Sequence, residues 1–453
     1  MVKQTAYIRD QSKDVPKNKN WKDITIHSHQ NCLEDKKAFA ANFKQVEQES
    51  NKVIANRIIQ NIEENNLIIN PPFQTMTEKE IDTSFDLPFT RLPHPKYKKR
   101  GTIPAHEMIK FSINMHRGCF GGCSFCTISA HQGKFIASRS QKSILNEVDQ
   151  VVDMPGFKGY ISDLGGPSAN MYKMKGVVQE TCDKCIAPSC IHPVVCSNLD
   201  TSHSQITEIY RKVDKHPKVK KAFIGSGIRH DLLTKSYNKN ADTSINDYMV
   251  QLLTRHVSGR LKVAPEHTSA DTLKIMRKPS FAHFKEFKKQ FDDIDRKFGL
   301  NQQLVPYFIS SHPGCKEEDM VNLAIETKEL GFKLEHVQDF TPTPMTVATV
   351  MYYSGYHPYT LKQYYTPKSK TEKINQHRFF FWYKRENQNW IRKRLNDAKR
   401  PDLLKRLLGS DQKELNQQVK VGNKVEPKSS ERFQRRKNKT GRINNTEKKR
   451  KRQ

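Results

Sequence analysis

Three cysteines in one short, glycine-rich loop constrain this chain more than any other feature of its sequence. Cys119, Cys123 and Cys126 have the spacing C-x3-C-x2-C and follow the apolar run from Met108 to Met115. Three thiolates at this spacing can hold three corners of a cubic iron–sulfur cluster and leave the fourth iron without a protein ligand. Glycines inside the loop let the backbone pass close to such a cluster. The loop therefore predicts a cluster with one open iron, which could bind and activate a small molecule.

Apolar stretches of strand length alternate with amphipathic helical segments after this loop. Such alternation predicts a parallel sheet with helical crossovers. The expected strands cover residues 108–115, 160–164, 220–225, 261–264, 303–310 and 334–340. Polar or glycine-containing motifs follow the strand ends, where barrel enzymes carry their chemistry. The expected fold class is α/β, with an open, partial (β/α)6 TIM-type barrel over residues 108–344.

The remaining segments are expected to flank this barrel. Apolar positions three and four residues apart predict a long helix over residues 35–65, and prolines predict an extended strap over 71–107, so that 1–107 form an N-terminal segment. Residues 345–409 are expected to form a C-terminal extension, in which the aromatic group at 379–383 is assigned to the core rather than to base stacking. Residues 410–453 contain too few apolar side chains to fold and are predicted to be a disordered basic tail.

Charge and cysteine content indicate the setting in which this chain works. The formal net charge is +30, and residues 431–453 carry 11 Lys or Arg against two Glu. A basic surface attracts nucleic acid, so RNA contact is an open prediction, although compositional bias explains the charge equally well. No apolar run could span a bilayer, and the first residues lack the apolar segment of a signal peptide. These features predict a cytoplasmic protein without membrane association, and the clustered spacings among its nine cysteines indicate metal ligands rather than disulfides.

The cysteine triplet, with Phe125 between its last two members, resembles the signature of the radical S-adenosylmethionine (SAM) superfamily. The resemblance implies that Cys119, Cys123 and Cys126 bind a [4Fe-4S] cluster whose open iron chelates SAM. It further implies reductive cleavage of SAM to a 5′-deoxyadenosyl radical, with an electron donor such as flavodoxin or ferredoxin as partner. The alternative for this loop is a structural zinc site, to which His116 or His131 could add the fourth ligand.

Longer phrases narrow the resemblance to the YgiQ-like radical SAM proteins, a family without an assigned reaction. They are His131-Gln132-Gly133, Ser138-Arg139-Ser140, Asp163-Leu164-Gly165-Gly166-Pro167, Ser226-Gly227-Ile228-Arg229, Ala264-Pro265-Glu266-His267-Thr268, Ser310-Ser311-His312-Pro313-Gly314 and Phe340-Thr341-Pro342-Thr343-Pro344-Met345-Thr346. In that family an N-terminal domain precedes these phrases. Because only some hundred residues precede the cysteine loop here, the chain is expected to lack that domain.

The resemblance also implies which residues contact SAM. Gly165 and Gly166 correspond to the superfamily's glycine pair after the second strand, whose backbone contacts the methionine amino group. The residue that usually follows this pair is Glu, and Pro167 takes its place here. Ser226 and Glu266 lie after the third and fourth strands, at the level where the superfamily holds ribose and adenine. The resemblance assigns no catalytic residue and no substrate.

A second cysteine set follows the second expected strand. Cys182, Cys185, Cys190 and Cys196 lie within fifteen residues, which suits either a closed zinc site or a second iron–sulfur cluster. Because the first cysteine set already predicts an iron–sulfur cluster in this chain, a second cluster is favoured over zinc. A different hypothesis for the whole chain is a nucleic-acid-binding protein in which both cysteine sets hold structural zinc.

Overall fold

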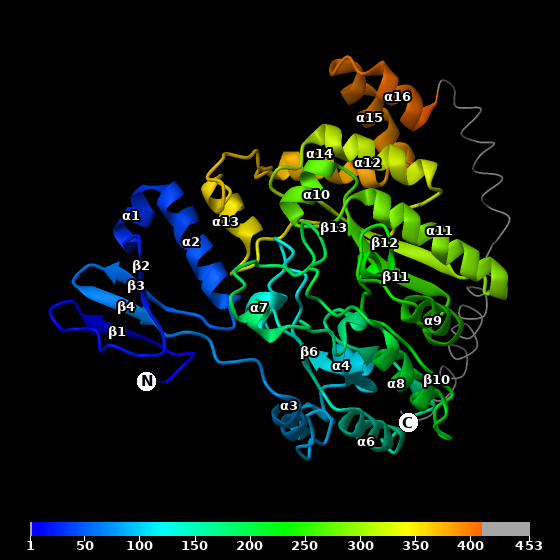
Figure 1. Cartoon of the computed structure of the whole chain (residues 1–453). Coiled ribbons are helices and arrows are strands. Elements are labelled where there is room, and N and C mark those ends of the chain that lie inside the picture. Colours follow the sequence, from blue (N-terminus) through cyan, green and yellow to red (C-terminus); the bar gives the residue numbers. More distant parts are fainter. Residues whose placement is uncertain (1, 410–453) are drawn as a thin grey trace, which may run out of the picture. The chain divides into compact units, whose positions relative to one another are not determined.

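The computed structural model describes residues 2–409 and shows a mixed α/β fold (Figure 1). The chain divides into two compact units, Met1–Tyr383 and Lys384–Gln453. The tail predicted over residues 410–453 lies outside the described residues.

A four-stranded sheet occupies the N-terminal part of the first unit, where the sequence predicted no strand. Its strands are β1 (Ala6–Asp10), β2 (Asp23–Ile26), β3 (Arg57–Ile62) and β4 (Asn65–Ile69), in the order β1-β4-β3-β2. Strands β2 and β3 are parallel, and the other pairs are antiparallel. The Arg57 side chain is fully buried and donates to Asp23 from Nε (2.8 Å) and Nη2 (2.7 Å), which ties β3 to β2.

The single helix predicted over residues 35–65 is wrong in its second half. Helices α1 (His29–Glu34) and α2 (Lys36–Ser50) end before this region, and β3 and β4 follow as a hairpin. Ile58, Ile59 and Ile62 fit a three- to four-residue period, but β-branched side chains also favour strands. Pairing with neighbouring strands selects the strand conformation over the helix. A sheet with one buried face needs both strands of this hairpin to be stable.

Short helices interrupt the segment that was predicted to be an extended strap. They are α3 (Glu78–Phe85), the 3-10 helix η1 (Pro95–Tyr97) and α4 (Pro104–Ile109). Helix α4 also covers the start of the first expected barrel strand, so that β5 is confined to Ser112–Asn114.

Parallel strands dominate the middle of the chain, as predicted. They are β5 (Ser112–Asn114), β8 (Tyr160–Ile161), β9 (Asp163–Gly165), β10 (Lys221–Ala222), β11 (Arg260–Glu266), β12 (Gln303–Ser310) and β13 (Val337–Asp339). The parallel pairs are β5–β9, β8–β10, β11–β12 and β12–β13, and a parallel bridge from Ile228 to Val263 joins the loop after β10 to β11. Pairing therefore follows chain order, and the loops after successive strands meet at one edge.

Helical segments separate these strands close to the predicted positions. They are α6 (Gln141–Val152), α8 (Ser204–Asp214), α9 (Ser244–Gln251), the π-helical turn η4 (Leu252–His256), α10 (Ala270–Met276), α11 (Phe281–Phe298) and α12 (Glu317–Glu329). In α11, Phe281, Phe284, Phe287 and Phe291 are buried at three- and four-residue steps. Each buried phenylalanine contributes about 1.5–3 kcal/mol, so this stripe is sufficient to fix the helix against the unit's core.

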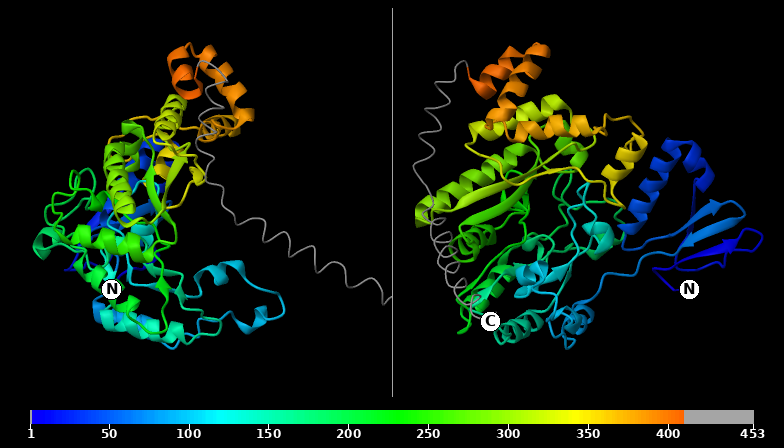
Figure 2. Two further views of the ribbon diagram at one scale, coloured as in Figure 1. Left: turned by 90° about the vertical axis from the view of Figure 1, so that its right-hand side faces the viewer. Right: turned by 180° about the vertical axis from the view of Figure 1, so that it is seen from behind.

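Helix α2 packs against α13 (Val347–Ser354), as seen in Figure 1 and from behind in Figure 2. An apolar cluster joins them through Ala40 and Phe43 on α2, Val347 and Met351 on α13, and Ile275 on α10. Helix α14 (Lys370–Phe380) packs against α12. Phe379, Phe380 and Trp382 are buried, which confirms the assignment of the aromatic group to the core.

The second unit contains α15 (Arg385–Asp397) and α16 (Pro401–Leu408) among its described residues. The two helices pack against each other, and Ile391, Leu395, Leu403 and Leu407 are buried.

Candidate functional site

The cysteine loop lies between two short strands, β6 (His116–Arg117) and β7 (Ala137–Ser138), which pair antiparallel. Gly118 has φ +90°, and the adjacent Cys119 N–H donates to the Gly133 carbonyl (3.0 Å). Gly122 has φ +59°, and a Cβ there would lie 2.9 Å from Ser189 Cβ. Glycine is required at these two positions because the backbone is left-handed and closely packed.

Contacts from three distant segments fix the middle of the loop. The Ser124 N–H donates to the Met276 carbonyl at the end of α10 (3.0 Å), and the Ser124 carbonyl accepts from Ala348 N–H on α13 (2.8 Å). The Ser124 hydroxyl is bonded to His312 Nε2 (3.3 Å), and the His312 ring packs edge-on against Phe125. The loop is therefore held rigidly before any ligand binds.

The three thiols of the loop converge. Cys119 is buried, whereas Cys123 and Cys126 are partly buried. Burial, and after it the neighbouring Cys123 and Cys119 thiolates, raise the pKa of Cys126 to about 12; burial and Cys123 also raise the pKa of Cys119. Closely spaced thiols with raised pKa values become thiolates only when a cation compensates them, and metal ligation does this.

Within residues 2–409, no three Cys, His, Asp or Glu side chains are grouped closely enough to hold one metal ion. Cysteines that bind different irons of one cluster stand farther apart than ligands that share an ion. The spacing of Cys119, Cys123 and Cys126 in the sequence is compatible with ligands to different irons of one cluster.

A buried arginine faces this loop. Arg229 Nη1 donates to Cys123 Sγ (3.3 Å), and Nε donates to Asp231 Oδ1 (3.0 Å). Both side chains are almost fully buried. Although burial alone would raise the pKa of Asp231, the Arg229 charge holds that pKa well below its usual range. A Cβ at Gly121 would lie 2.7 Å from Arg229 Nη1, so only glycine leaves room for the guanidinium.

The structure brings several of the residues implicated in SAM binding to the same edge of the sheet. Gly165 ends β9, and a Cβ there would lie 3.1 Å from Ser226 Oγ. The Ser226 hydroxyl donates to Asp163, which also accepts from the Gly225 N–H (2.8 Å). Ser168, just beyond the glycine pair, has its hydroxyl 3.6 Å from Cys119 Sγ. Gly165 and Ser226 therefore meet beside the cysteine loop.

Glu266 approaches the loop from the end of β11. It is buried with φ +70°, a left-handed conformation that is strained for glutamate. Burial raises the pKa of this carboxyl. The Lys278 ammonium, 3.8 Å away, lowers the pKa and offsets part of the increase. The Glu266 charge makes the smallest contribution to the raised pKa of Cys126, so the two groups lie within electrostatic range of each other.

The second cysteine set packs directly against the first loop. Cys190 N–H donates to the Phe120 carbonyl (3.0 Å), and the Ser189 hydroxyl donates to the Gly121 carbonyl (2.8 Å). Burial raises the pKa of Cys190 to about 11, and Cys182, Cys185 and Cys196 are close enough to raise it further. The buried Lys134 contacts Cys185 Sγ through its ammonium (3.6 Å). All four thiols therefore gather beside the loop of Cys119.

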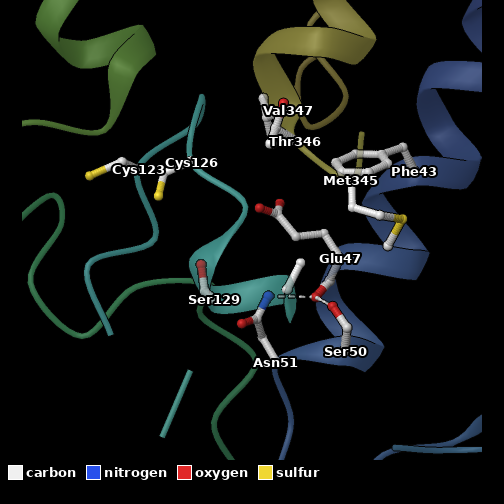
Figure 3. Close-up of a pocket in the computed structure, with 11 residues that line it drawn as sticks. Phe43, Glu47, Ser50, Asn51, Cys123, Cys126, Ser129, Met345, Thr346 and Val347 are labelled. Carbon is white, nitrogen blue, oxygen red and sulfur yellow. Dashed lines mark hydrogen bonds between the residues drawn. The ribbon is translucent and has the colours of Figure 1, made fainter. Parts of the chain in front are cut away.

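Sequence reasoning missed the contribution of α2. A pocket beside Cys123 and Cys126 is closed on its other side by Phe43 and Glu47 (Figure 3). The Glu47 carboxylate points from α2 toward the cysteine loop and accepts from Arg277 Nη1 (2.7 Å), Arg277 Nη2 (2.9 Å) and Tyr359 Oη (2.6 Å). In the sequence Glu47 is one polar residue of an amphipathic helix, and no pattern distinguishes it.

Substitution at Gly166 should destabilise the protein, whereas the same substitution at Gly227 should not. A Cβ at Gly166 would lie 2.6 Å from Nδ1 and 2.7 Å from Nε2 of the buried His116, whose pKa is lowered to about 4 by burial. Overpacking of this kind costs about 1–3 kcal/mol. At Gly227 a Cβ would meet nothing within 4 Å, so Gly227→Ala should stay within about 0.5 kcal/mol of wild type. Thermal unfolding compares the two, and equal losses would contradict the packing argument.

Two family models and several relatives match this chain. Residues 1–112 match the family model described as "Radical SAM N-terminal", and residues 335–453 match "Domain of unknown function (DUF3362)". A UPF0313 protein of Bacteroides thetaiotaomicron is 57% identical over 413 residues, which cover 91% of this chain and 66% of that protein. A UPF0313 protein of Porphyromonas gingivalis is 56% identical, with 90% and 64% covered.

This chain belongs to the UPF0313 family of radical SAM proteins. It spans about two thirds of the length of these two relatives, and 60% of a UPF0313 protein of Methanocella arvoryzae that is 43% identical. The match over residues 1–112 puts the radical SAM N-terminal signature on the segment where the sequence predicted only a helix and a strap. That segment is the β1–β4 sheet with α1 and α2.

The radical SAM methyltransferase TsrM of Kitasatospora setae, solved with cobalamin and a [4Fe-4S] cluster, is a distant structural neighbour. It is 14% identical, with a TM-score of 0.38, 65% of this chain and 49% of TsrM being covered. A similarity this low supports no argument about activity. Neither the family models nor the relatives support the alternative of a nucleic-acid-binding protein with structural zinc sites.

Proposed function

We propose that this UPF0313 protein is a radical SAM enzyme that cleaves SAM reductively and directs the resulting 5′-deoxyadenosyl radical to a substrate. The observation that carries the proposal is the convergence of three partly or fully buried thiols in a rigid loop after β5. In this role Cys119, Cys123 and Cys126 hold a [4Fe-4S] cluster. The bound cluster supplies one electron to SAM; the protein orients SAM and excludes water and oxygen.

Residues at the strand ends would hold SAM beside the three cysteines. Gly165 and Gly166 offer backbone groups at the end of β9, where His116 lies against Gly166. Ser226 is oriented by Asp163, and Glu266, at the end of β11, lies within electrostatic range of Cys126. Phe125 is held by His312 and closes the loop on the side of β12. Each of these groups is fixed by a contact to the protein, as a preorganised site requires.

We propose that residues 108–344 form a partial (β/α)6 barrel, with 1–107 and 345–409 as flanking regions. Parallel pairing in chain order supports this arrangement. Polar residues at the carboxyl ends of barrel strands are the usual location of catalytic groups, and the cysteine loops lie there. The extension after residue 344 would then close the site through α13, whose Ala348 binds the loop at Ser124.

For the second cysteine set we favour an auxiliary iron–sulfur cluster over zinc. Cys190 N–H donates to the Phe120 carbonyl and the Ser189 hydroxyl to the Gly121 carbonyl, so a cluster held there would adjoin the first one. Lys134 at Cys185 would offset part of its negative charge.

The remaining expectations concern partners and location. A flavodoxin or ferredoxin would supply the electron. The net charge of +30 makes RNA contact a further proposal. The basic residues 431–453, which would take part in it, lie outside the described residues. None of the helices in residues 2–409 has the length and apolar character to cross a membrane. A cytoplasmic location stays a prediction.

Anaerobic purification and reaction with SAM test the proposal. We expect a brown protein with about four iron atoms and four sulfides per cluster, hence about eight of each if both cysteine sets are filled. After reduction with dithionite it should convert SAM to 5′-deoxyadenosine and methionine, measured by chromatography. Zinc without sulfide, together with no 5′-deoxyadenosine, would reject the proposal.

A further inference from the structure

A second cavity, distinct from that of Figure 3, opens among three loops that follow neighbouring strands. Residues 192–195 come from the loop after β9, residues 236–239 from the loop after β10, and residues 270–283 from the region after β11. The cavity has a volume of about 410 Å³. That size suits a small organic molecule rather than a solvent ion. We call it the lysine pocket, after Lys239, Lys274 and Lys278, which line it.

The lysine pocket is strongly cationic. His192 and His283 line it beside the three lysines, and none of its lining residues is Asp or Glu. Among residues 2–409, neither Lys239 nor Lys274 has a carboxylate within ion-pair distance. Glu286 on α11 stands nearby but bonds to Ser236.

One wall of the lysine pocket is apolar and aromatic. Val194 and Leu273 both line the pocket, and the Val194 side chain is 68% exposed. The Tyr237 and His283 rings pack with centroids 5.0 Å apart. A ligand with both a ring or apolar part and an anionic group would use the two kinds of lining together.

The floor of the lysine pocket connects it to the cysteine site. Lys278 is buried, lines the pocket, and has its ammonium 3.8 Å from Glu266, one of the residues proposed to hold SAM. A molecule anchored by the lysines would therefore lie close to a residue that the proposed function assigns to SAM.

We propose that the lysine pocket binds the phosphate group of the substrate, a phosphate monoester joined to a ring. A monoester carries about 1.5–2 negative charges near pH 7, which matches several ammonium groups better than one carboxylate does. The ligand is called a substrate on the basis of the proposed function. Binding of phosphate itself requires neither SAM nor an electron.

Calorimetric titration of the anaerobically purified full chain tests the proposal. The probes are adenosine monophosphate, ribose 5-phosphate, inorganic phosphate and benzoate. We expect the two esters to bind more tightly than inorganic phosphate or benzoate, and binding to weaken with salt. Benzoate binding as tightly as the esters, or no ester binding at all, would overturn the proposal. SAM cleavage is assayed separately, so its failure does not decide this test.

Paired variants identify the site. Lys239→Gln combined with Lys274→Gln removes two exposed lysines of the pocket, and ester affinity should fall at least about tenfold, since charge-assisted hydrogen bonds are lost. The matched control is Lys235→Gln with Lys262→Gln, which removes two exposed lysines that do not line the pocket. Equal weakening by both pairs would show only a general charge effect and would overturn the assignment.

Discussion

Replacement of Cys123 by alanine should remove the first iron–sulfur cluster and abolish SAM cleavage. Cys123 is the middle member of the triplet and the cysteine that Arg229 contacts. A cluster with only two protein ligands loses a covalent bond that no neighbouring group can replace. Loss of a supporting contact alone costs metal sites about 10–100-fold, so loss of a ligand should exceed about 100-fold in the rate of 5′-deoxyadenosine formation.

Two control variants make this result specific. Cys32→Ala removes another buried thiol, whose Sγ contacts Asn42 Nδ2 (3.0 Å) in the N-terminal segment, and should leave iron content and SAM cleavage unchanged. Cys190→Ala should instead lower the iron that belongs to the second set. Retained cleavage in the Cys123 variant would reject the cluster assignment, and loss in the Cys32 variant would point to general instability.

The alternation of parallel strands and helices in the middle of the chain was predictable from sequence because its local and long-range signals agree. Strand β12 matches its expected bounds, since a buried parallel strand is almost continuously apolar, and α11 buries one phenylalanine stripe of helical period. The N-terminal segment was not predictable in the same way. Ile58, Ile59 and Ile62 fit both a helical and a strand pattern, and pairing with residues far along the chain decides the outcome.

The cysteine sets were recognisable because all their chemistry lies within short stretches of sequence. The groups around them were not. Arg277 meets Glu47 across 230 positions of the chain, and Tyr359 meets it across 312. Arg229 ends a phrase that the sequence analysis singled out, but its buried pairing with Asp231 and its contact to Cys123 depend on the fold. The spacing of cysteines in the sequence can identify metal ligands. The charged side chains that surround those ligands come from distant segments and can be identified only from the three-dimensional structure.

Replacement of Arg229 by methionine should destabilise the protein strongly, and a second substitution should separate this effect from one on the cluster. The single variant leaves the buried Asp231 carboxylate without its counter-charge, which costs about 3–5 kcal/mol. Arg229→Met with Asp231→Asn removes both charges and should recover most of the loss. The Arg57–Asp23 pair in the N-terminal sheet provides a matched control, because Arg57 is also fully buried but lies in a different part of the unit. Thermal unfolding measures the single and the double variant at Arg229 and Asp231, and the corresponding single and double variants at Arg57 and Asp23.

The double variant at Arg229 and Asp231 should then show what the guanidinium does for the proposed cluster. It lacks the N–H that donates to Cys123 Sγ, while the net charge of the pair is unchanged because the Asp231 charge is removed as well. Hydrogen bonds to cluster sulfurs raise reduction potentials, so the midpoint potential of a first cluster held by this loop should become more negative. Redox titration followed by electron paramagnetic resonance measures it, with the double variant at Arg57 and Asp23 expected to match wild type. An unchanged potential in a stable Arg229 and Asp231 variant would mean that this pair only supports the fold.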